Sequence, residues 1–557
     1  MSRAIFTALL REAAPSTARA TQEIEVERRR REITRRRSEF SGCKELENTT
    51  VAIVGGGLAG LMAAKVLSLQ GVKVRLFEAN KELGGRVRSN HSFCEGRITE
   101  EGAELVGSMH LTWLALAREY GLGLITRTDG DYHARLGLEV KVKLDKLLAW
   151  TEVMQVVIDL RNRILEKFGQ DARSILDPSR PWIPTSPTGW LQVQRWDGMS
   201  VGDKLSNLGI AKGSRLWLAM ELLLRNNNVA PLDELNYLGL LCLIKGHKLV
   251  DRLGEHVEDP HLLGYWTELE IFRCADGCQA VVHGLERELE GREPASIQAS
   301  AMVTAIDLDK RELKWARAIG GAPQFGSMKT QKFDYVILAI PPTVWAKVKD
   351  IKPEHPKNTA LASFGIGKAA KFFSNVKERF WIKQGAAPLG GSVDFGQVWE
   401  GTDNQTTARS RNQGILLNVF AGDRILTTDE YKNGLEGLYP GYKSQLRAAK
   451  LVDWSKELFI ETGYASPKKG QILTLGQRLN QPFHDILFFA GEHTQMNGFG
   501  YMEGALLSGE RAALNVMRKV CNVRSQVAEA ESPALDEWES VTDAELEDLY
   551  AAVLDEH

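Results

Sequence analysis

The clearest hydrophobic pattern in the chain lies near residue 50, where two strand-like runs flank a segment of helical composition. The apolar, β-branched run Val51–Val54 predicts a buried strand, Leu61–Leu69 predicts a helix, and Val72–Phe77 predicts a second strand. A glycine-rich turn with the spacing G-x-G-x-x-G joins the first strand to the helix, and its glycines are Gly55, Gly57 and Gly60. The pattern therefore predicts a βαβ unit.

This turn has the properties of a phosphate-binding turn. The first glycine allows a tight turn, the second lets the backbone approach a pyrophosphate, and the third lets the helix pack closely on the strand. The phosphate then lies at the positive end of the helix. Glu78 ends the second strand about 20 residues further on, where a carboxylate can bind the ribose hydroxyls of an adenosine. We therefore predict a bound dinucleotide, held by Gly55, Gly57, Leu58, Ala59, Gly60, Glu78 and Ala79.

Beyond this unit, the hydrophobic pattern differs between long segments. Residues Thr126–Leu269 have helical periodicity, whereas Lys347–Asp453 mixes predicted strands and helices. The runs Val303–Leu308 and Asp334–Pro342 predict strands, and the proline-containing segment Pro178–Pro187 predicts a loop.

Composition sets the scale and excludes one class of partner. With 557 residues, of which 43% are hydrophobic, the chain can form two or more domains. Its formal net charge of -2 argues against nucleic-acid binding. Charge is unevenly spread, because Glu23–Arg37 is basic and Glu529–Glu556 is acidic. We expect both to be solvated helical extensions that can pair with each other, while a targeting role for Met1–Arg19 stays open.

Membrane, secretory and metal-binding signals are missing from the sequence. No apolar run reaches the length of about 18 residues that crosses a bilayer, so we expect no membrane contact and a cytoplasmic location. The cysteines form no C-x-x-C pair and no ligand cluster, and they are Cys43, Cys94, Cys242, Cys274, Cys278 and Cys521. We expect reduced cysteines and no bound metal.

Two further segments narrow the choice of cofactor. The segment NKELGGRVRS, Asn80–Ser89, brings a second glycine pair and an arginine toward the pyrophosphate. The segment FFAGEHTQMNGFGYMEGALLSGERAA, Phe488–Ala513, combines a strand, a Gly-Glu turn and a helix that begins near Tyr501. Both resemble the flavin amine oxidase superfamily. The resemblance implies FAD, and non-covalent FAD because Gly463 stands where covalently flavinylated relatives carry cysteine. The further cofactor contacts that it implies are Gly84, Gly85, Arg86, Val303, Gly491, Glu492, Gly500, Tyr501 and Met502.

The resemblance also implies the fold class. We expect an α/β protein with a discontinuous Rossmann-like FAD-binding domain and a mixed α+β substrate-binding domain. The first domain is expected to comprise residues 46–124, 270–346 and 459–520. The second is expected to comprise residues 125–269 and 347–458. Residues 1–45 form the basic extension and residues 521–557 the acidic tail. We further expect a homodimer or a higher homo-oligomer.

The same resemblance implies a reaction. Members of the superfamily pass a hydride from the carbon bearing the amino group to the flavin, which dioxygen reoxidises with release of hydrogen peroxide. The segment KAAKFFSNVKERFW, Lys368–Trp381, is similar to the one that carries the family's catalytic lysine, and its spacing identifies Lys371. Tyr464 and Tyr501 match the two tyrosines between which the amine passes. The structural alternatives are an exposed strand lysine and two core tyrosines.

The substrate is less clearly specified. The long extension before the glycine turn and the segment QVWEGTDNQ, Gln397–Gln405, look more like an L-amino acid oxidase. The resemblance implies a small-molecule amino acid or amine and dioxygen as partners. However, the segment GAELVGSMH, Gly102–His110, lacks the carboxylate-binding arginine of such enzymes. A monoamine or polyamine oxidase is the alternative, and a flavoprotein that has lost turnover is a third reading.

Helical spacing predicts a substitute cation for a substrate carboxylate. In SRLWLAMELLLRNNN, Trp217, Glu221 and Arg225 recur at i, i+4 and i+8, so they share one face of a predicted helix. A tryptophan beside a charged pair suits a bulky amino acid, although a surface salt bridge beside an anchoring tryptophan gives the same pattern. The remaining pocket candidates are the rival cations Lys245, Lys248 and Arg273, and the aromatic Trp399.

Overall fold

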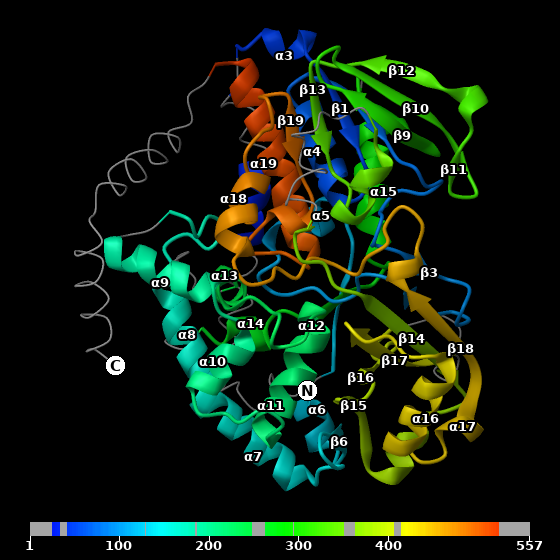
Figure 1. Ribbon diagram of the computed structural model, residues 1–557. Coiled ribbons are helices and arrows are strands. Elements are labelled where there is room, and N and C mark those ends of the chain that lie inside the picture. Colours follow the sequence, from blue (N-terminus) through cyan, green and yellow to red (C-terminus); the bar gives the residue numbers. More distant parts are fainter. Residues whose placement is uncertain are drawn as a thin grey trace.

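The computed structural model describes residues 25–33, 40, 42–128, 130–183, 186–247, 262–292, 294–349, 363–405 and 414–522. The expectations for Met1–Arg19, Lys248 and Glu529–Glu556 lie outside these residues. Figure 1 shows a sheet with its helices in the upper half of the molecule, a group of helices at the lower left and another sheet at the lower right.

The upper sheet consists of five parallel strands in the order β19-β13-β1-β2-β8. The strands are β1 (Thr50–Val54), β2 (Lys73–Phe77), β8 (Ser296–Gln298), β13 (Tyr335–Leu338) and β19 (Leu487–Phe489). The central strand β1 places Val54 opposite both Phe77 and Leu338. Four of its five residues are buried, as expected for a parallel strand covered on both faces. All five strands come from residues 46–124, 270–346 and 459–520.

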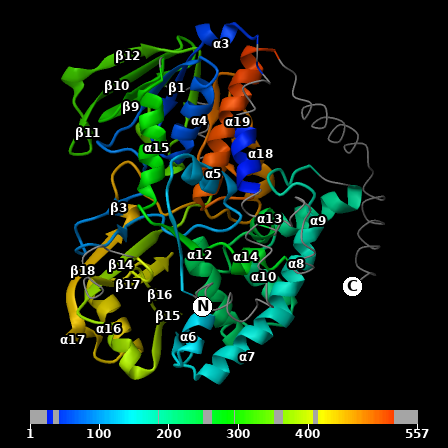
Figure 2. The same cartoon turned by 180° about the vertical axis from the view of Figure 1, so that it is seen from behind.

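Four helices pack around this sheet, namely α4 (Leu58–Ser68), α5 (Leu111–Glu119), α15 (Gln279–Glu290) and α19 (Met502–Val520). Seen from behind in Figure 2, α4 stands between α15 and α19, and it contacts both. All residues of α4 are buried, including Lys65, which forms ion pairs with Glu119 and Glu288. The predicted βαβ unit is therefore confirmed, and its helix begins at Leu58 because Gly57 is the N-cap.

A four-stranded antiparallel sheet adjoins the parallel one. Its strands are β9 (Ala301–Asp307), β10 (Glu312–Ile319), β11 (Ala322–Pro323) and β12 (Lys329–Lys332). Trp315 of β10 contacts Phe77 of β2, with 5.7 Å between the ring centroids, so the two sheets share apolar contacts.

The lower sheet has six strands in the order β18-β14-β17-β16-β15-β6. They are β6 (Glu139–Lys143), β14 (Ala369–Val376), β15 (Ala386–Ser392), β16 (Gly396–Glu400), β17 (Ile415–Gly422) and β18 (Leu446–Asp453). Neighbours are antiparallel except β6 and β15. The helices α16 (Thr428–Leu438) and α17 (Tyr442–Gln445) accompany this sheet. These strands all come from residues 125–269 and 347–458.

The predicted helical segment forms the lower-left group of helices (Figure 1). The group consists of α7 (Trp150–Leu160), α8 (Glu166–Arg173), α9 (Pro187–Asp197), α10 (Val201–Asn207), α11 (Arg215–Met220), α12 (Asn226–Asn228), α13 (Tyr237–Gly246) and α14 (Gly264–Thr267), whereas α6 (Gly130–Arg135) contacts β6 and β15 of the lower sheet. The smaller elements are α3 (Glu45–Asn48), α18 (Gln477–Leu479), and the strand pairs β3 (Ser89–Asn90) with β4 (Thr99–Glu100) and β5 (Leu124–Thr126) with β7 (Phe272–Cys274).

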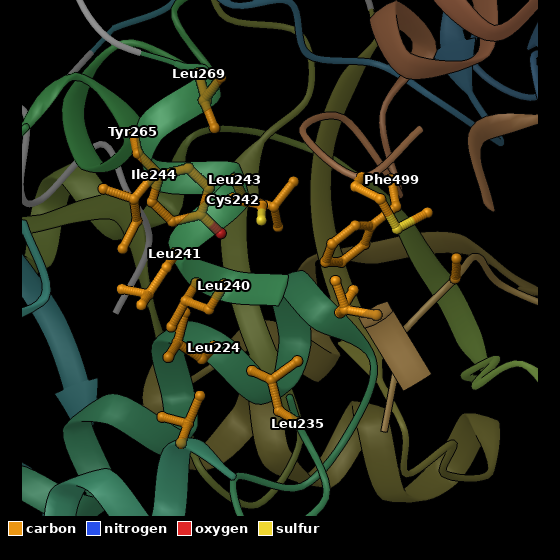
Figure 3. Packing of buried hydrophobic residues seen from close by; sticks show 14 of the residues in the cluster. Leu224, Leu235, Leu240, Leu241, Cys242, Leu243, Ile244, Tyr265, Leu269 and Phe499 are labelled. Carbon is orange, nitrogen blue, oxygen red and sulfur yellow. The ribbon is translucent and has the colours of Figure 1, made fainter. Parts of the chain in front are cut away.

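The core around α13 joins the two halves of the molecule. Figure 3 shows Leu240, Leu243 and other side chains of α13 surrounded by residues of neighbouring segments, among them Phe499. A Cβ atom added to Gly239 would lie 3.4 Å from the Phe499 ring, so α13 packs closely on the loop that leads into α19. Through this contact, the helical group packs against the loop before α19.

The basic N-terminal segment is not a solvated extension over the part that the structure describes. Residues 25–33 form a helix whose Val26 and Ile33 belong to the same core cluster as α4 and α19. Arg29, between them on the same face, forms an ion pair with Glu510 and donates to Thr112 Oγ1 at 3.0 Å. The expectation was wrong because the many arginines of this segment obscured its short apolar face.

The expectation of uniformly reduced cysteines is also wrong. Cys43 and Cys521 form a disulfide across a sequence separation of 478 residues, while Cys94, Cys242, Cys274 and Cys278 are free and buried. The prediction considered only closely spaced cysteines, and these two lie too far apart in the sequence for their spacing to indicate a bond. Within the described ranges, no helix is both long and apolar enough to cross a bilayer, and no cluster of His, Cys, Asp or Glu residues is suited to a metal ion.

Candidate active site

A cavity of about 270 Å³ runs from the ends of β1 and β2 to the strands β14, β16 and β17 of the lower sheet. It therefore lies between the two halves of the molecule. The predicted cofactor residues that line it are Gly55, Gly57, Leu58, Ala59, Glu78, Gly84, Gly85, Arg86, Gly491, Glu492, Gly500, Tyr501 and Met502. Ala79 and Val303 instead line a smaller adjoining cavity, which shares Gly55, Glu78 and Ile340 with the first.

The three glycines of the turn at the cavity have different steric roles. Gly55 has φ +110°, and a Cβ there would lie 2.6 Å from the Ala339 carbonyl oxygen. A Cβ at Gly60 would lie 1.9 Å from the Gly55 oxygen, so Gly60 allows α4 to approach β1. By contrast, a Cβ at Gly57 would have only the Gly84 oxygen nearby, at 4.0 Å. Gly57 therefore leaves room beside the α4 N-terminus, as a bound pyrophosphate requires.

Glu78 is held in a fixed orientation at the same end of the cavity. Its carboxylate accepts from the Gly56 N–H at 2.8 Å and from the Asn80 N–H at 2.7 Å. Burial raises the pKa of Glu78, although these two N–H donors act in the opposite direction. The open space at Gly57, the α4 N-terminus and this carboxylate together fit the pyrophosphate and ribose of FAD.

The start of α19 forms the opposite wall. Gly500 has φ +82°, Tyr501 is the N-cap, and Met502 is the first helical residue. Glu492 accepts from the Gly500 N–H at 2.7 Å and from Arg86 Nη1 at 2.7 Å. Burial alone would raise the pKa of Glu492, but the Arg86 charge and the other donors hold it below its usual value. Glu492 is therefore a buried carboxylate that stays ionised.

Lys371 lies on β14 and is buried, so it is not an exposed strand lysine. Its Nζ donates to Glu104 Oε2 at 2.7 Å and to the Glu100 carbonyl oxygen at 3.0 Å. Glu104 also accepts from Trp399 Nε1 and from Arg273 Nε, each at 2.9 Å. Burial favours the neutral acid, but the charges of Lys371 and Arg273 outweigh it and lower the pKa of Glu104 to about 2. The result is a charged cluster at the cavity wall.

Aromatic rings complete this part of the cavity. Tyr464, Tyr501, Phe420 and Trp399 all line it. The Tyr464 ring is nearly parallel to that of Phe420, with an interplanar angle of 10° and 6.5 Å between centroids. The Tyr464 hydroxyl donates to the carbonyl oxygen of Asn227 at 3.0 Å. The structure therefore brings the three predicted catalytic residues and Trp399 to one cavity.

Trp217 and Arg225 do not line this cavity, so the predicted carboxylate site on their helix face is wrong. Trp217 is buried in the core, and Arg225 forms ion pairs with Glu221 at 3.2 Å and with Asp423 at 2.9 Å. The segment Glu221–Arg225 is a π-helical turn between α11 and α12. The i,i+4 ion pair still forms across this turn beside a buried tryptophan, so the structure shows the alternative that the same spacing allowed.

The rival cations are also occupied elsewhere. Lys245 donates to the Arg173 carbonyl oxygen at 3.0 Å, and Arg273 is paired with Glu104 and Asp403. Among the described residues that line the cavity, the lysines and arginines are Arg86 and Lys371. Each of them has a carboxylate partner, Glu492 and Glu104 respectively. A free cation for a substrate carboxylate is therefore missing from the described lining.

Several lining residues had not been predicted from the sequence. Glu104 and Glu270 add negative charge, Asn227 and Gln397 add amides joined by a 3.0 Å hydrogen bond, and Phe420 adds a ring. Glu270 lies 3.5 Å from Arg127 Nη1. Only Glu104 had a usable signal, because it lies in the segment Gly102–His110, where amino acid oxidases carry a carboxylate-binding arginine.

Comparisons with known proteins agree with this geometry. The family model of flavin containing amine oxidoreductases matches residues 58–517. The flavin-containing amine oxidase of Danio rerio is 24% identical over 509 residues, covering 87% of this chain and 89% of that protein. The flavin-containing amine oxidase A of Canis lupus familiaris is 26% identical over 509 residues, covering 86% of each.

Solved structures share the fold. Wild-type putrescine oxidase bound to putrescine superimposes with a TM-score of 0.65 at 18% identity, covering 84% of this chain and 99% of that one. Cyclohexylamine oxidase from Brevibacterium oxydans IH-35A gives a TM-score of 0.65 at 17% identity, covering 85% and 99%. Both are similar to this chain over both halves of the molecule.

Proposed function

Because the chain belongs to the flavin-containing amine oxidoreductase family, we propose that it is an FAD-dependent oxidase of amines that carry no α-carboxylate. The products are the carbonyl compound, ammonia and hydrogen peroxide. This corresponds to the monoamine or polyamine alternative, which the relatives fit better than the L-amino acid reading. Bound FAD would supply the hydride acceptor, which dioxygen then reoxidises.

The observation that carries this proposal is the charge of the cavity wall. An amino acid needs a cation for its carboxylate, and an unpaired carboxylate in a buried site is costly. Arg86 and Lys371 are already paired with Glu492 and Glu104, and Glu270, a further carboxylate of the lining, is paired with Arg127. Each cation of the described wall is thus committed to a carboxylate of the protein, which disfavours a zwitterion, whereas an amine without a carboxylate needs no such cation.

The protein's own residues have separate roles in this proposal. The electron-rich faces of Tyr464 and Tyr501 attract an amino group and restrict its orientation. Lys371 has three N–H donors, two of which bind Glu104 and the Glu100 carbonyl oxygen. The third is left for a group in the cavity that Lys371 lines, and an N–H donor fixed there can stabilise negative charge that develops on dioxygen.

Two observations support non-covalent FAD. A Cβ at Gly463 would lie 2.6 Å from the Ala369 Cβ and 2.7 Å from its nitrogen, so the site has no room for a cysteine side chain. In addition, none of the four free cysteines lines the cavity.

The experiment is anaerobic reduction of the purified flavoprotein, followed by loss of the visible flavin absorption. Each amino acid is paired with its own decarboxylated amine: L-tryptophan with tryptamine, and L-lysine with cadaverine. We expect reduction by the amines and not by the amino acids. Reduction by the amino acids alone would overturn the proposal and require a carboxylate site in the undescribed residues. If neither class reduces the flavin, the chain is not an amine oxidase of this kind.

A further inference from the structure

A single buried carboxylate connects the two chain segments that carry the cavity tyrosines. Glu492 follows β19, and its side chain is 7% exposed. Its Oε2 accepts the Gly500 N–H at 2.7 Å, and Gly500 directly precedes Tyr501. Its two oxygens also lie 3.2 and 3.3 Å from the Ala465 nitrogen, which donates to them and directly follows Tyr464. One side chain thus binds the Tyr464–Ala465 peptide and the N–H of the residue that precedes Tyr501.

Arg86 reinforces the same connection. Its Nη1 donates to Glu492 Oε1 at 2.7 Å and to the Gly463 carbonyl oxygen at 2.8 Å. Gly463 directly precedes Tyr464, so the peptides on both sides of Tyr464 are bound by the Arg86–Glu492 pair. Because the pair is largely buried, its hydrogen bonds are charge-assisted and poorly screened by water.

The two tyrosine segments also touch at Gly500. A Cβ at Gly500 would lie 3.0 Å from the Tyr464 ring, so the backbone before Tyr501 rests on that ring. A displacement of the Gly500 peptide would therefore change the position of both rings. The hydrogen bond from Gly500 to Glu492 opposes this displacement.

We propose that Glu492, together with Arg86, is the positioning residue that sets the relative placement of Tyr464 and Tyr501. It thereby determines the shape of the passage that selects the amine. This inference deepens the proposed function and rests on it for the substrate. It goes beyond cofactor binding, because this carboxylate accepts hydrogen bonds from Arg86 and from backbone N–H groups adjacent to the two tyrosines.

The chemistry of the group explains why a carboxylate is needed. Three N–H donors, from Gly500, Ala465 and Arg86, converge on two oxygens that only accept. A glutamine of the same shape has one accepting oxygen, and its NH₂ group would face another donor. Glu492→Gln is therefore a nearly isosteric variant that must release at least one of these donors, the Gly500 N–H or Arg86.

The test compares Glu492→Gln with Ser508→Ala in the FAD-saturated enzyme. Ser508 Oγ accepts the Gly491 N–H at 2.9 Å, so it supports the same turn without contacting a peptide next to either tyrosine. Both proteins are labelled with 3-fluorotyrosine, and the fluorine NMR signals are assigned by Tyr464→Phe and Tyr501→Phe. We expect Glu492→Gln to shift or broaden both signals and Ser508→Ala to leave them unchanged.

Kinetics supply the second measurement. In Glu492→Gln, kcat/KM for benzylamine should fall by roughly 10- to 100-fold, since small misplacement of orienting groups has effects of this size. The ratio of kcat/KM for benzylamine and n-butylamine should also change, whereas the dissociation constant of FAD should not. Unchanged fluorine signals with weakened FAD binding alone would overturn the inference and assign Glu492 to the cofactor only.

A further variant covers the case in which Glu492→Gln does not fold. Arg86→Lys keeps the positive charge but cannot keep the geometry of both hydrogen bonds from Nη1. It should perturb the Tyr464 signal more than the Tyr501 signal, because Arg86 binds the Gly463 carbonyl directly. Equal or absent effects on the two signals would contradict the inference. If the wild type oxidises no amine, the proposed function fails, yet the NMR comparison still tests the positioning role.

Discussion

Substitution of Gly60 and of Gly57 by alanine should have opposite consequences, although both glycines belong to one turn. A Cβ at residue 60 would lie 1.9 Å from the Gly55 oxygen and 3.1 Å from its carbon, and neither atom is part of a flexible side chain. The start of α4 would have to move away from β1 by about 1 Å, and overpacking of this kind costs about 1–3 kcal/mol or more. Because every residue of α4 is buried, we expect Gly60→Ala to lower the free energy of unfolding by at least about 3 kcal/mol.

Gly57→Ala is the matched control for this steric argument. Its Cβ would meet only the Gly84 oxygen at 4.0 Å, and the φ of -77° at Gly57 suits alanine. The stability of the apoprotein should therefore change by less than about 1 kcal/mol. The added methyl group would, however, occupy the space beside the α4 N-terminus. We expect FAD affinity to fall at least about tenfold, which corresponds to about 1.4 kcal/mol.

Two assays separate the two roles. Denaturant unfolding of the apoproteins measures the steric cost in the protein itself, and FAD titration followed by flavin fluorescence measures the cost to the cofactor. An apo Gly60→Ala protein as stable as the wild type would refute the packing role of Gly60. Wild-type FAD affinity in Gly57→Ala would refute the assignment of the pyrophosphate to this end of the cavity.

Four further predictions follow from other parts of the structure. Lys371→Met should slow reoxidation of the reduced enzyme by dioxygen about 100-fold in stopped-flow mixing, and an equal slowing of anaerobic reduction would contradict its role. The lowered pKa of Glu104 stabilises the fold above its usual value of 4.5, and this contribution is lost as the pH falls toward about 2. The stability advantage of the wild type over Glu104→Gln should therefore shrink between neutral pH and about pH 3 in denaturant unfolding, and a constant difference would exclude this linkage. Reduction of the Cys43–Cys521 disulfide should lower the free energy of unfolding by about 2–4 kcal/mol, whereas Cys521→Ser should already be destabilised and insensitive to reductant. Acid denaturation should release all flavin into the supernatant, and flavin retained on the precipitated chain would show a covalent bond.

The local part of the fold could be predicted from the sequence because its determinants lie close together in the chain. Strand β1, the glycine turn and α4 follow one another within 20 residues, and Gly55 and Gly60 stand where a Cβ atom would collide with the backbone. The predicted helix began three residues late only because Gly57, rather than an apolar residue, is its N-cap. Lys371, Tyr464 and Tyr501 were predicted from the family resemblance, because residue spacing alone does not identify them as site residues.

The substrate side of the cavity could not be predicted in the same way. The charged cluster joins Glu104 to Lys371, Arg273 and Trp399, which lie on β14, β7 and β16. These strands lie far apart in the sequence, so residue spacing does not predict that they come together. The ion pair between Lys371 and Glu104 could therefore be found only from the structure. The prediction for Trp217 and Arg225 failed for a different reason, since helical spacing places residues on one face but does not show that Arg225 is paired with Glu221 and Asp423 outside the cavity.

The disulfide between Cys43 and Cys521 also changes the topology of the molecule. It closes nearly the whole described chain into one covalent ring, with the two Cα atoms 5.9 Å apart. A ring has no preferred starting point, so the positions of the natural ends carry little information about the fold. New ends opened at the exposed turn around Gly320, between β10 and β11, would leave both sides of the flavin cavity on one connected chain. The protein is thus a natural template for circular permutation.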